Sequence, residues 1–210
     1  LCTGSGIIGI TFSKYFDSIE GVDINQEAIK WAQLNSQINS TDNYKPSSGD
    51  LYIPVKDKKP FDVVFANPSY SFYPPEIKEK YKIRDYEESG NLGLALTLKI
   101  IEGFDQFLTE QGEAYICTAA PIKNGKDYLI QQLHEKFSNQ DYSFKIYYTH
   151  QITIHEENKE YYNTLGVNKM YFVYITVKKG EPFTIIKERS KMFYFSHLPR
   201  NMVPKKLDVL

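Results

Sequence analysis

Residues 1–10 read LCTGSGIIGI, and within them Gly4, Gly6 and Gly9 form the pattern Gly-x-Gly-x-x-Gly. Glycines at this spacing are typical of the tight turn that joins the first strand of a βαβ unit to the helix after it. An acidic residue, Asp23, lies 19 positions after Gly4, where the second strand of such a unit would end. The stretch therefore predicts an α/β fold that holds a nucleotide-like ligand over this turn.

The glycine turn by itself leaves two kinds of cofactor open. NAD and S-adenosylmethionine both contain a ribose, and proteins that bind either one use a tight turn together with a carboxylate that accepts hydrogen bonds from the ribose hydroxyls. One hypothesis is an NAD-dependent oxidoreductase that uses GSGIIG, residues 4–9, as its pyrophosphate loop. The other is an enzyme that uses S-adenosylmethionine, and the rest of the chain has to distinguish them.

After the turn, helix-like and strand-like patterns alternate along the chain. We expect helices at 7–16, 26–38, 92–108 and 127–137, and strands at 19–24, 48–51, 61–66 and 113–119. Two further strands, near 142–154 and 169–178, are joined by a polar stretch without a helix and should form an antiparallel hairpin at the sheet edge. The fold class that follows is a doubly wound, Rossmann-like α/β sheet, mostly parallel, with an antiparallel edge hairpin.

The beginning of the sequence is unusual for this fold. Leu1 stands where a strand should already be ending, so the first strand is largely missing from the chain. We expect a supporting strand, and a further domain with it, upstream of Leu1. Within the chain, residues 1–180 are predicted to form the catalytic domain and residues 181–210 a C-terminal extension of unknown role.

Composition narrows the class of protein. The 210 residues carry a net charge of −1 and are 41% hydrophobic, which is enough for a core and gives no overall attraction to phosphate. Apolar runs are too short for a membrane helix. Cys2 and Cys117 are isolated and lie beside apolar runs, which favours reduced thiols in a cytoplasmic protein. His150 and His155 would lie on opposite faces of a strand, so we expect no metal site.

The segment that separates the two cofactor hypotheses is 61–70, FDVVFANPSY. A buried strand ends there in Asn67, Pro68 and Tyr70, at the edge where open α/β sheets bind their ligands. The Asn67 side-chain carbonyl and the Pro68 backbone carbonyl can each accept one N–H of a planar nitrogen. Those two hydrogen bonds turn the nitrogen lone pair toward an electrophile, and the Tyr70 ring can stack on the flat group that carries the nitrogen.

These motifs together resemble the class I S-adenosylmethionine-dependent methyltransferases of the NPPY type, which methylate amide or exocyclic amino nitrogens. The resemblance implies S-adenosylmethionine as cofactor and Asn67, Pro68 and Tyr70 as catalytic residues. It implies that the cofactor is bound by Thr3, Gly4, Ser5, Gly6, Asp23, Ile24, Asp50, Leu51 and Asn67. Ser69 departs from the family pattern, which has a second proline at this position, and a serine leaves the backbone freer there.

The substrate is not fixed by these motifs. The family implies a glutamine side chain of a protein, an amino group of a nucleic acid, or a small molecule with an amide or amino group. Basic and aromatic residues mix in the stretch 187–206, where they could follow a nucleic-acid backbone or pack on a neighbouring domain. A third hypothesis is a non-catalytic scaffold that keeps the methyltransferase fold.

Overall fold

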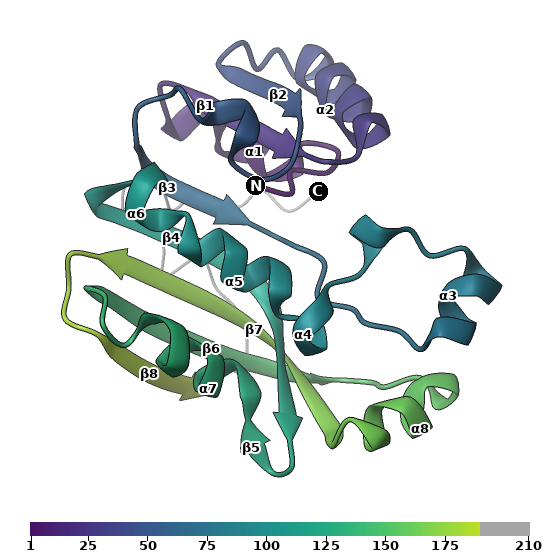
Figure 1. Ribbon diagram of the computed structural model, residues 1–210. Coiled ribbons are helices and arrows are strands. Elements are labelled where there is room, and N and C mark those ends of the chain that lie inside the picture. Colours follow the sequence, from purple (N-terminus) through teal and green to yellow (C-terminus); the bar gives the residue numbers. More distant parts are fainter. Residues whose placement is uncertain (190–210) are drawn as a thin grey trace.

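The structure is a computed structural model, and it describes residues 1–189 of the 210-residue chain. Strands form two groups that lie one above the other in Figure 1. The smaller group carries the N-terminal βα segments, and the larger group forms a mixed sheet with helices packed against it. The expected doubly wound α/β fold with an antiparallel hairpin is confirmed, although several element boundaries differ from those predicted.

The smaller group pairs β1 (Ile19–Asp23) in parallel with β2 (Tyr44–Ser48). The helices α1 (Ile7–Phe12) and α2 (Gln26–Ile38) and the 3₁₀ turn η1 (Ser13–Tyr15) accompany this pair. The strand expected at 48–51 instead occupies 44–48, because Leu51 has a φ of 44° and the chain turns there. Among the described strands β2 pairs only with β1, and such an edge strand can hold Pro46, which has no N–H to donate.

The larger sheet has the order β3-β4-β7-β6-β8, and β5 pairs with β4 as a short extension. Its strands are β3 (Phe61–Ala66), β4 (Leu108–Lys123), β5 (Lys126–Asp127), β6 (Tyr142–Ile152), β7 (Val167–Lys179) and β8 (Thr184–Arg189). β3 runs parallel to β4, whereas β7 is antiparallel to both β4 and β6. The hairpin is thus as predicted, but β8 adds a parallel strand outside β6 and forms the edge. The boundary at residue 180 stays a prediction.

The connection between β6 and β7 was predicted to contain no helix, and this prediction was wrong. Residues Glu156–Thr164 form the helix α8. Its polar sequence hid it, since only Asn158 and Tyr162 are buried. The Tyr162 ring stacks on Phe72 with centroids 4.1 Å apart, and its hydroxyl donates to the Phe72 carbonyl at 2.9 Å. Contacts with a distant segment therefore stabilise a helix that has little apolar periodicity of its own.

The segment expected as one helix at 92–108 is broken into three. α4 (Gly90–Gly93) contains two residues with left-handed backbone, Asn91 and Leu92, and is followed by α5 (Ala95–Glu102) and α6 (Phe104–Phe107). The segment 68–89 contains α3 (Pro75–Tyr81) and the 3₁₀ turn η3 (Asp85–Glu87). A further 3₁₀ turn, η2 (Ile53–Val55), follows β2, and α7 (Tyr128–Phe137) precedes β6.

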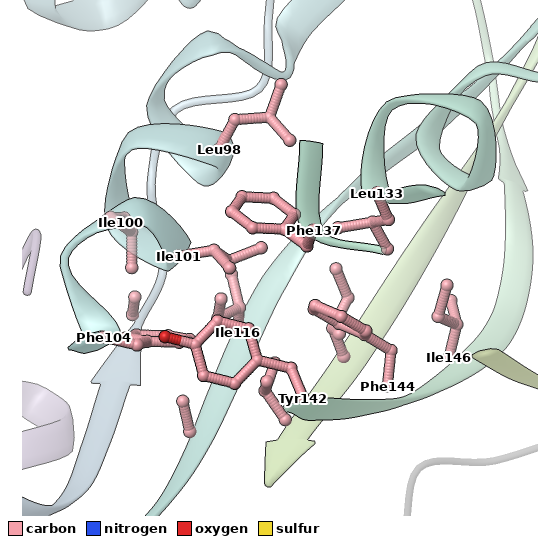
Figure 2. Close-up of a cluster of buried hydrophobic side chains, with 14 of the residues drawn as sticks. Leu98, Ile100, Ile101, Phe104, Ile116, Leu133, Phe137, Tyr142, Phe144 and Ile146 are labelled. Carbon is pink, nitrogen blue, oxygen red and sulfur yellow. The ribbon is translucent and has the colours of Figure 1, made fainter. Parts of the chain in front are cut away.

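The main core lies between the larger sheet and the helices α5, α6 and α7 (Figure 2). Side chains that are almost completely buried interdigitate there, among them Ile101, Phe104, Ile116, Leu133, Phe137 and Phe144. Burial of an aliphatic or aromatic side chain stabilises a fold by about 1.5–3 kcal/mol each. This core holds β3 and β4 in place. It therefore also fixes the sheet edge at which β3 ends and Asn67 follows.

Residues 1–3 lie between β1 and β3, which do not pair with each other. The Leu1 ammonium donates to the Phe65 carbonyl at 2.6 Å, and the Thr3 amide donates to the Val22 carbonyl at 3.0 Å. A cavity of about 90 Å³ lined by residues of both strands remains beside them. Residues 1–3 thus occupy the position of the first strand, most of which was expected to be missing from the chain.

Candidate functional site

The glycine turn has the backbone conformation that its sequence predicts. Gly4 and Gly6 have φ values of 54° and 92°, a region that L side chains rarely adopt. A Cβ on Gly6 would also lie 3.1 Å from the Tyr44 ring, whereas a Cβ on Gly4 would meet nothing within 4 Å. Asn35 on α2 donates to the Ser5 carbonyl at 2.9 Å. The turn is therefore held from behind by α2 and faces open space at Gly4.

Asp23 ends β1 and is bound to the glycine turn. Its two carboxylate oxygens accept from the backbone amides of Gly4 at 2.8 Å and of Asn25 at 2.9 Å. Each carboxylate oxygen can accept more than one hydrogen bond, so Asp23 retains acceptor capacity for hydroxyl groups. The same residue thus orders the turn and offers a negative charge beside it.

A second turn lies next to Asp23. The Gly49 amide donates to the Asp23 backbone carbonyl at 2.9 Å, which brings the turn after β2 beside the end of β1. Asp50 is exposed there, and Leu51 has positive φ. An exposed carboxylate such as that of Asp50 can accept hydrogen bonds from the edge of an aromatic base. An apolar side chain such as that of Leu51 can pack against the face of the same base.

The Asn67-Pro68-Ser69-Tyr70 segment leaves β3 at the same edge. Asn67 is exposed and Pro68 is buried. The Tyr70 ring packs edge-on against Phe172 of β7, with centroids 5.7 Å apart. Burial raises the pKa of the Tyr70 phenol, so the hydroxyl stays protonated at neutral pH and the ring acts as a neutral surface.

One cavity of about 680 Å³ joins these segments. Of the predicted site residues, it is lined by Thr3, Gly4, Ser5, Asp23, Ile24, Asp50, Leu51 and Asn67. Gly6 is buried behind the turn, and Pro68 and Tyr70 do not line the cavity. The volume suits a ligand of the size of a nucleoside joined to an amino acid. The functional roles of all these residues stay predictions.

Comparison with known proteins assigns the first part of the chain. Residues 1–76, which hold the glycine turn and the Asn67 motif, match the methyltransferase small domain. The resemblance to the class I S-adenosylmethionine-dependent methyltransferases is confirmed. The match covers the glycine turn, Asp23, Asp50 and Asn67, which line the cavity. It favours the methyltransferase hypothesis over the NAD-dependent oxidoreductase.

Two curated methyltransferases illustrate the likeness. A release factor glutamine methyltransferase of Thermodesulfovibrio yellowstonii is 33% identical over 124 residues, which are 55% of this chain and 44% of that protein. A ribosomal protein uL3 glutamine methyltransferase of Francisella tularensis is 34% identical over 121 residues, 53% of this chain and 38% of that protein. The chain thus spans less than half the length of these relatives.

Solved structures show the same methyltransferase fold at low sequence identity. An rRNA methylase from Streptococcus thermophilus superposes with a TM-score of 0.51 at 11% identity, over 84% of this chain and 82% of that one. The YcgJ protein of Bacillus subtilis superposes with a TM-score of 0.50 at 14% identity, over 86% and 90%. Since identity is this low, these likenesses concern the fold alone.

The sequence analysis missed part of the cavity that Asn67 lines. Its far wall comes from residues that follow the Asn67 motif: Asp85, Tyr86, Glu88, Ser89, Gly90, Ala95, Leu96 and Lys99. Of the aromatic residues in this segment, Tyr86 lines the cavity. Phe72 instead packs on Tyr162, away from the cavity. No local signal marks Leu96 or Lys99, because they reach the cavity only through the break before α5.

The charge around the cavity that Asn67 and the glycine turn line is predominantly negative. Four carboxylates, those of Asp23, Asp50, Asp85 and Glu88, line it against the single ammonium of Lys99. Glu88 is paired with Lys78 of α3. A site of this sign attracts a cationic ligand and repels phosphate groups. Among residues 1–189 no cluster of three metal-ligating side chains is present, and no helix in that range is long and apolar enough to cross a membrane.

Cys117, which lies outside this cavity, should be unreactive. Burial raises the pKa of the Cys117 thiol from 9.0 to about 11, so at pH 8 the reactive thiolate is about 100-fold scarcer than in an unburied thiol. We expect Cys117 to be alkylated by iodoacetamide far more slowly in the native protein than after unfolding in guanidinium. Peptide mass spectrometry over a time course measures both rates. Equal rates in the two states would contradict the burial of this thiol.

Proposed function

We propose that this protein transfers the methyl group of S-adenosylmethionine to the side-chain amide nitrogen of a glutamine in a protein substrate. The observation that carries the proposal is that Asn67 and the glycine turn line one cavity. Its relatives of 33% and 34% identity are named as glutamine methyltransferases that act on a release factor and a ribosomal protein. The negative charge around the cavity supports a protein substrate over a nucleic acid.

The residues present fit the proposed cofactor. Gly4 leaves an open cradle in front of the turn, and Asp23 offers acceptors for ribose hydroxyls at its side. Ile24 and Leu51 supply apolar surface for the adenine, with Asp50 beside them for its amino group. The surrounding carboxylates complement the positive charges of the sulfonium and of the amino group. When bound, S-adenosylmethionine supplies an electrophilic methyl group.

The chain's own contribution to the reaction is positioning. The Asn67 side-chain oxygen and the Pro68 carbonyl each accept one N–H of the glutamine amide, which directs the nitrogen lone pair in line with the methyl carbon. S-adenosylmethionine would supply the methyl carbon for the new N–C bond, and its sulfur would keep the electron pair of the broken C–S bond. As the nitrogen becomes positive, the two carbonyl dipoles stabilise it and its proton passes to water. Tyr70 follows these acceptors in the chain, and its ring, packed on Phe172, is proposed to exclude solvent.

Methyl transfer to purified acceptor proteins tests the proposal. The full-length protein is incubated with tritium-labelled S-adenosylmethionine and with the release factor or the ribosomal protein uL3 of its own source organism. The expected result is label in one of them, with one added methyl group on a glutamine by tandem mass spectrometry, and a strongly reduced rate of labelling with Asn67→Ala. Transfer to ribosomal RNA, DNA or a free amine alone, turnover of NAD, or cofactor binding without any transfer would each overturn it.

A further inference from the structure

The chain makes a long excursion between the Asn67 motif and α5. It leaves β3, passes through α3, which projects from the molecule in Figure 1, and returns through η3 to Ser89. Two hydrogen bonds close the base of this excursion. The Ser69 hydroxyl donates to the Glu87 carbonyl at 2.7 Å, and the Ser89 amide donates to the Ser71 carbonyl at 2.7 Å.

The acceptor of the Ser69 hydrogen bond is itself fixed. The Glu87 amide donates to the Arg84 carbonyl at 2.8 Å, and the Glu87 carboxylate accepts from the Arg84 amide at 2.9 Å and from its guanidinium at 2.5 Å. These reciprocal bonds hold one tight turn. The Glu87 carbonyl oxygen, which accepts from the Ser69 hydroxyl, is therefore held in a defined position.

The segment in which the excursion returns, at Ser89, is also held by hydrogen bonds. Ser89 Oγ accepts from the Leu96 amide at 3.0 Å, and the Ser89 carbonyl accepts from the Gly93 amide at 3.1 Å. Gly93 has a φ of 88°, and a Cβ on it would lie 2.2 Å from the Tyr70 carbonyl oxygen. Asn91 and Leu92 adopt left-handed backbone, a costly conformation that persists where surrounding contacts enforce it. The segments that begin and end the excursion are thus packed backbone against backbone, at Tyr70 and Gly93.

We propose that Ser69 is a positioning residue for methyl transfer, and this inference rests on the proposed function. Its hydrogen bond to Glu87 replaces, by a tertiary contact, the backbone restraint that a proline ring would give at this position. The bond fixes the turn that carries the Asn67 side chain and the Pro68 carbonyl relative to the opposite cavity wall. Ser69, Glu88 and Ser89 all line that cavity, so the bond joins the side of the site that holds Asn67 to the side formed by 85–90.

This placement predicts which step of the reaction the bond affects. The contacts of Asp23 with Gly4 and Asn25 involve none of the residues of the excursion. Loss of the Ser69 bond should therefore leave cofactor binding unchanged and lower the turnover number. A net neutral hydrogen bond corresponds to about a fivefold change in rate or equilibrium.

The test compares Ser69→Ala with Ser69→Thr, which keeps a hydroxyl, and with Ser71→Ala as the matched control. The Ser71 side chain makes neither of the two bonds at the base. Three quantities are measured on the full-length protein: kcat and KM for methylation of the acceptor identified above, the Kd for S-adenosylhomocysteine by calorimetry, and hydrogen exchange of the backbone amides of 70–89.

We expect Ser69→Ala to lower kcat about fivefold and to leave the Kd for S-adenosylhomocysteine unchanged. The backbone amides of 70–89 should exchange their hydrogens faster in this variant than in the parent protein. Ser69→Thr and Ser71→Ala should match the parent protein. An unchanged kcat in Ser69→Ala, or an equal loss in Ser71→Ala, would overturn the inference. If the parent protein methylates no acceptor, the proposed function fails by itself. Hydrogen exchange then still decides whether Ser69 ties the excursion, and unchanged exchange would remove that contact as well.

Discussion

Asn67→Ala is expected to lower the kcat of methyl transfer by about 100- to 1000-fold, the usual cost of removing one preorganised polar group from a reaction centre. The Asn67 side chain supplies one of only two proposed acceptors for the substrate amide. Without it, the nitrogen lone pair loses its orientation toward the methyl group. Steady-state methylation of the acceptor protein measures kcat and KM for the variant and its parent.

The asparagine is well placed for such an experiment because its side chain is exposed at the end of β3. Truncating it should leave the melting temperature unchanged. Affinity for S-adenosylhomocysteine should fall much less than kcat, although Asn67 lines the cavity proposed to hold the cofactor. Asn168→Ala, an exposed asparagine outside this cavity, is the control for amide removal. A variant at Asn67 with parental kcat would exclude the proposed role.

The second large effect is expected at Asp23. Asp23→Ala should weaken S-adenosylhomocysteine binding by about 100-fold or more, since hydrogen bonds to a charged group contribute about 1.5–3 kcal/mol each. The substitution removes the proposed acceptor for the ribose. It also leaves the Gly4 amide without its carboxylate partner, so the glycine turn loses one of its hydrogen bonds to β1. Isothermal titration calorimetry of the full-length protein measures the change.

Two further variants separate charge from position. Asp23→Asn keeps the shape and one acceptor oxygen but places an amide group against a backbone N–H, so its affinity should lie between those of Asp23→Ala and the parent. Asp42→Ala removes the same charge from an exposed position outside the cavity and should bind as the parent does. Parental affinity in Asp23→Ala, or binding of NAD in place of S-adenosylhomocysteine, would refute the cofactor assignment.

Residues near in sequence were the easiest to assign. The turn at 4–9 and the strand ends at Asp23 and Asn67 were evident because glycine conformation and apolar strand runs are local properties. The strand at 61–66 and the helix at 26–38 appear with the predicted bounds. Helix α8 was missed because Tyr162 is buried by residues distant in sequence, among them Phe72 and Ala119. No pattern within nine polar residues carries that information.

The sequence by itself indicated the type of fold and the kind of ligand that it suits. The glycine turn was recognised by its spacing, and Asp23 and Asn67 were recognised because each stands at the end of an apolar run typical of a strand. Only the tertiary structure decided the wall of the cavity at Glu88, Ser89 and Lys99, and the tie between Ser69 and Glu87. Those positions depend on where a twenty-residue excursion returns to the sheet. Contacts between segments distant in sequence set that return, and a local pattern cannot encode them.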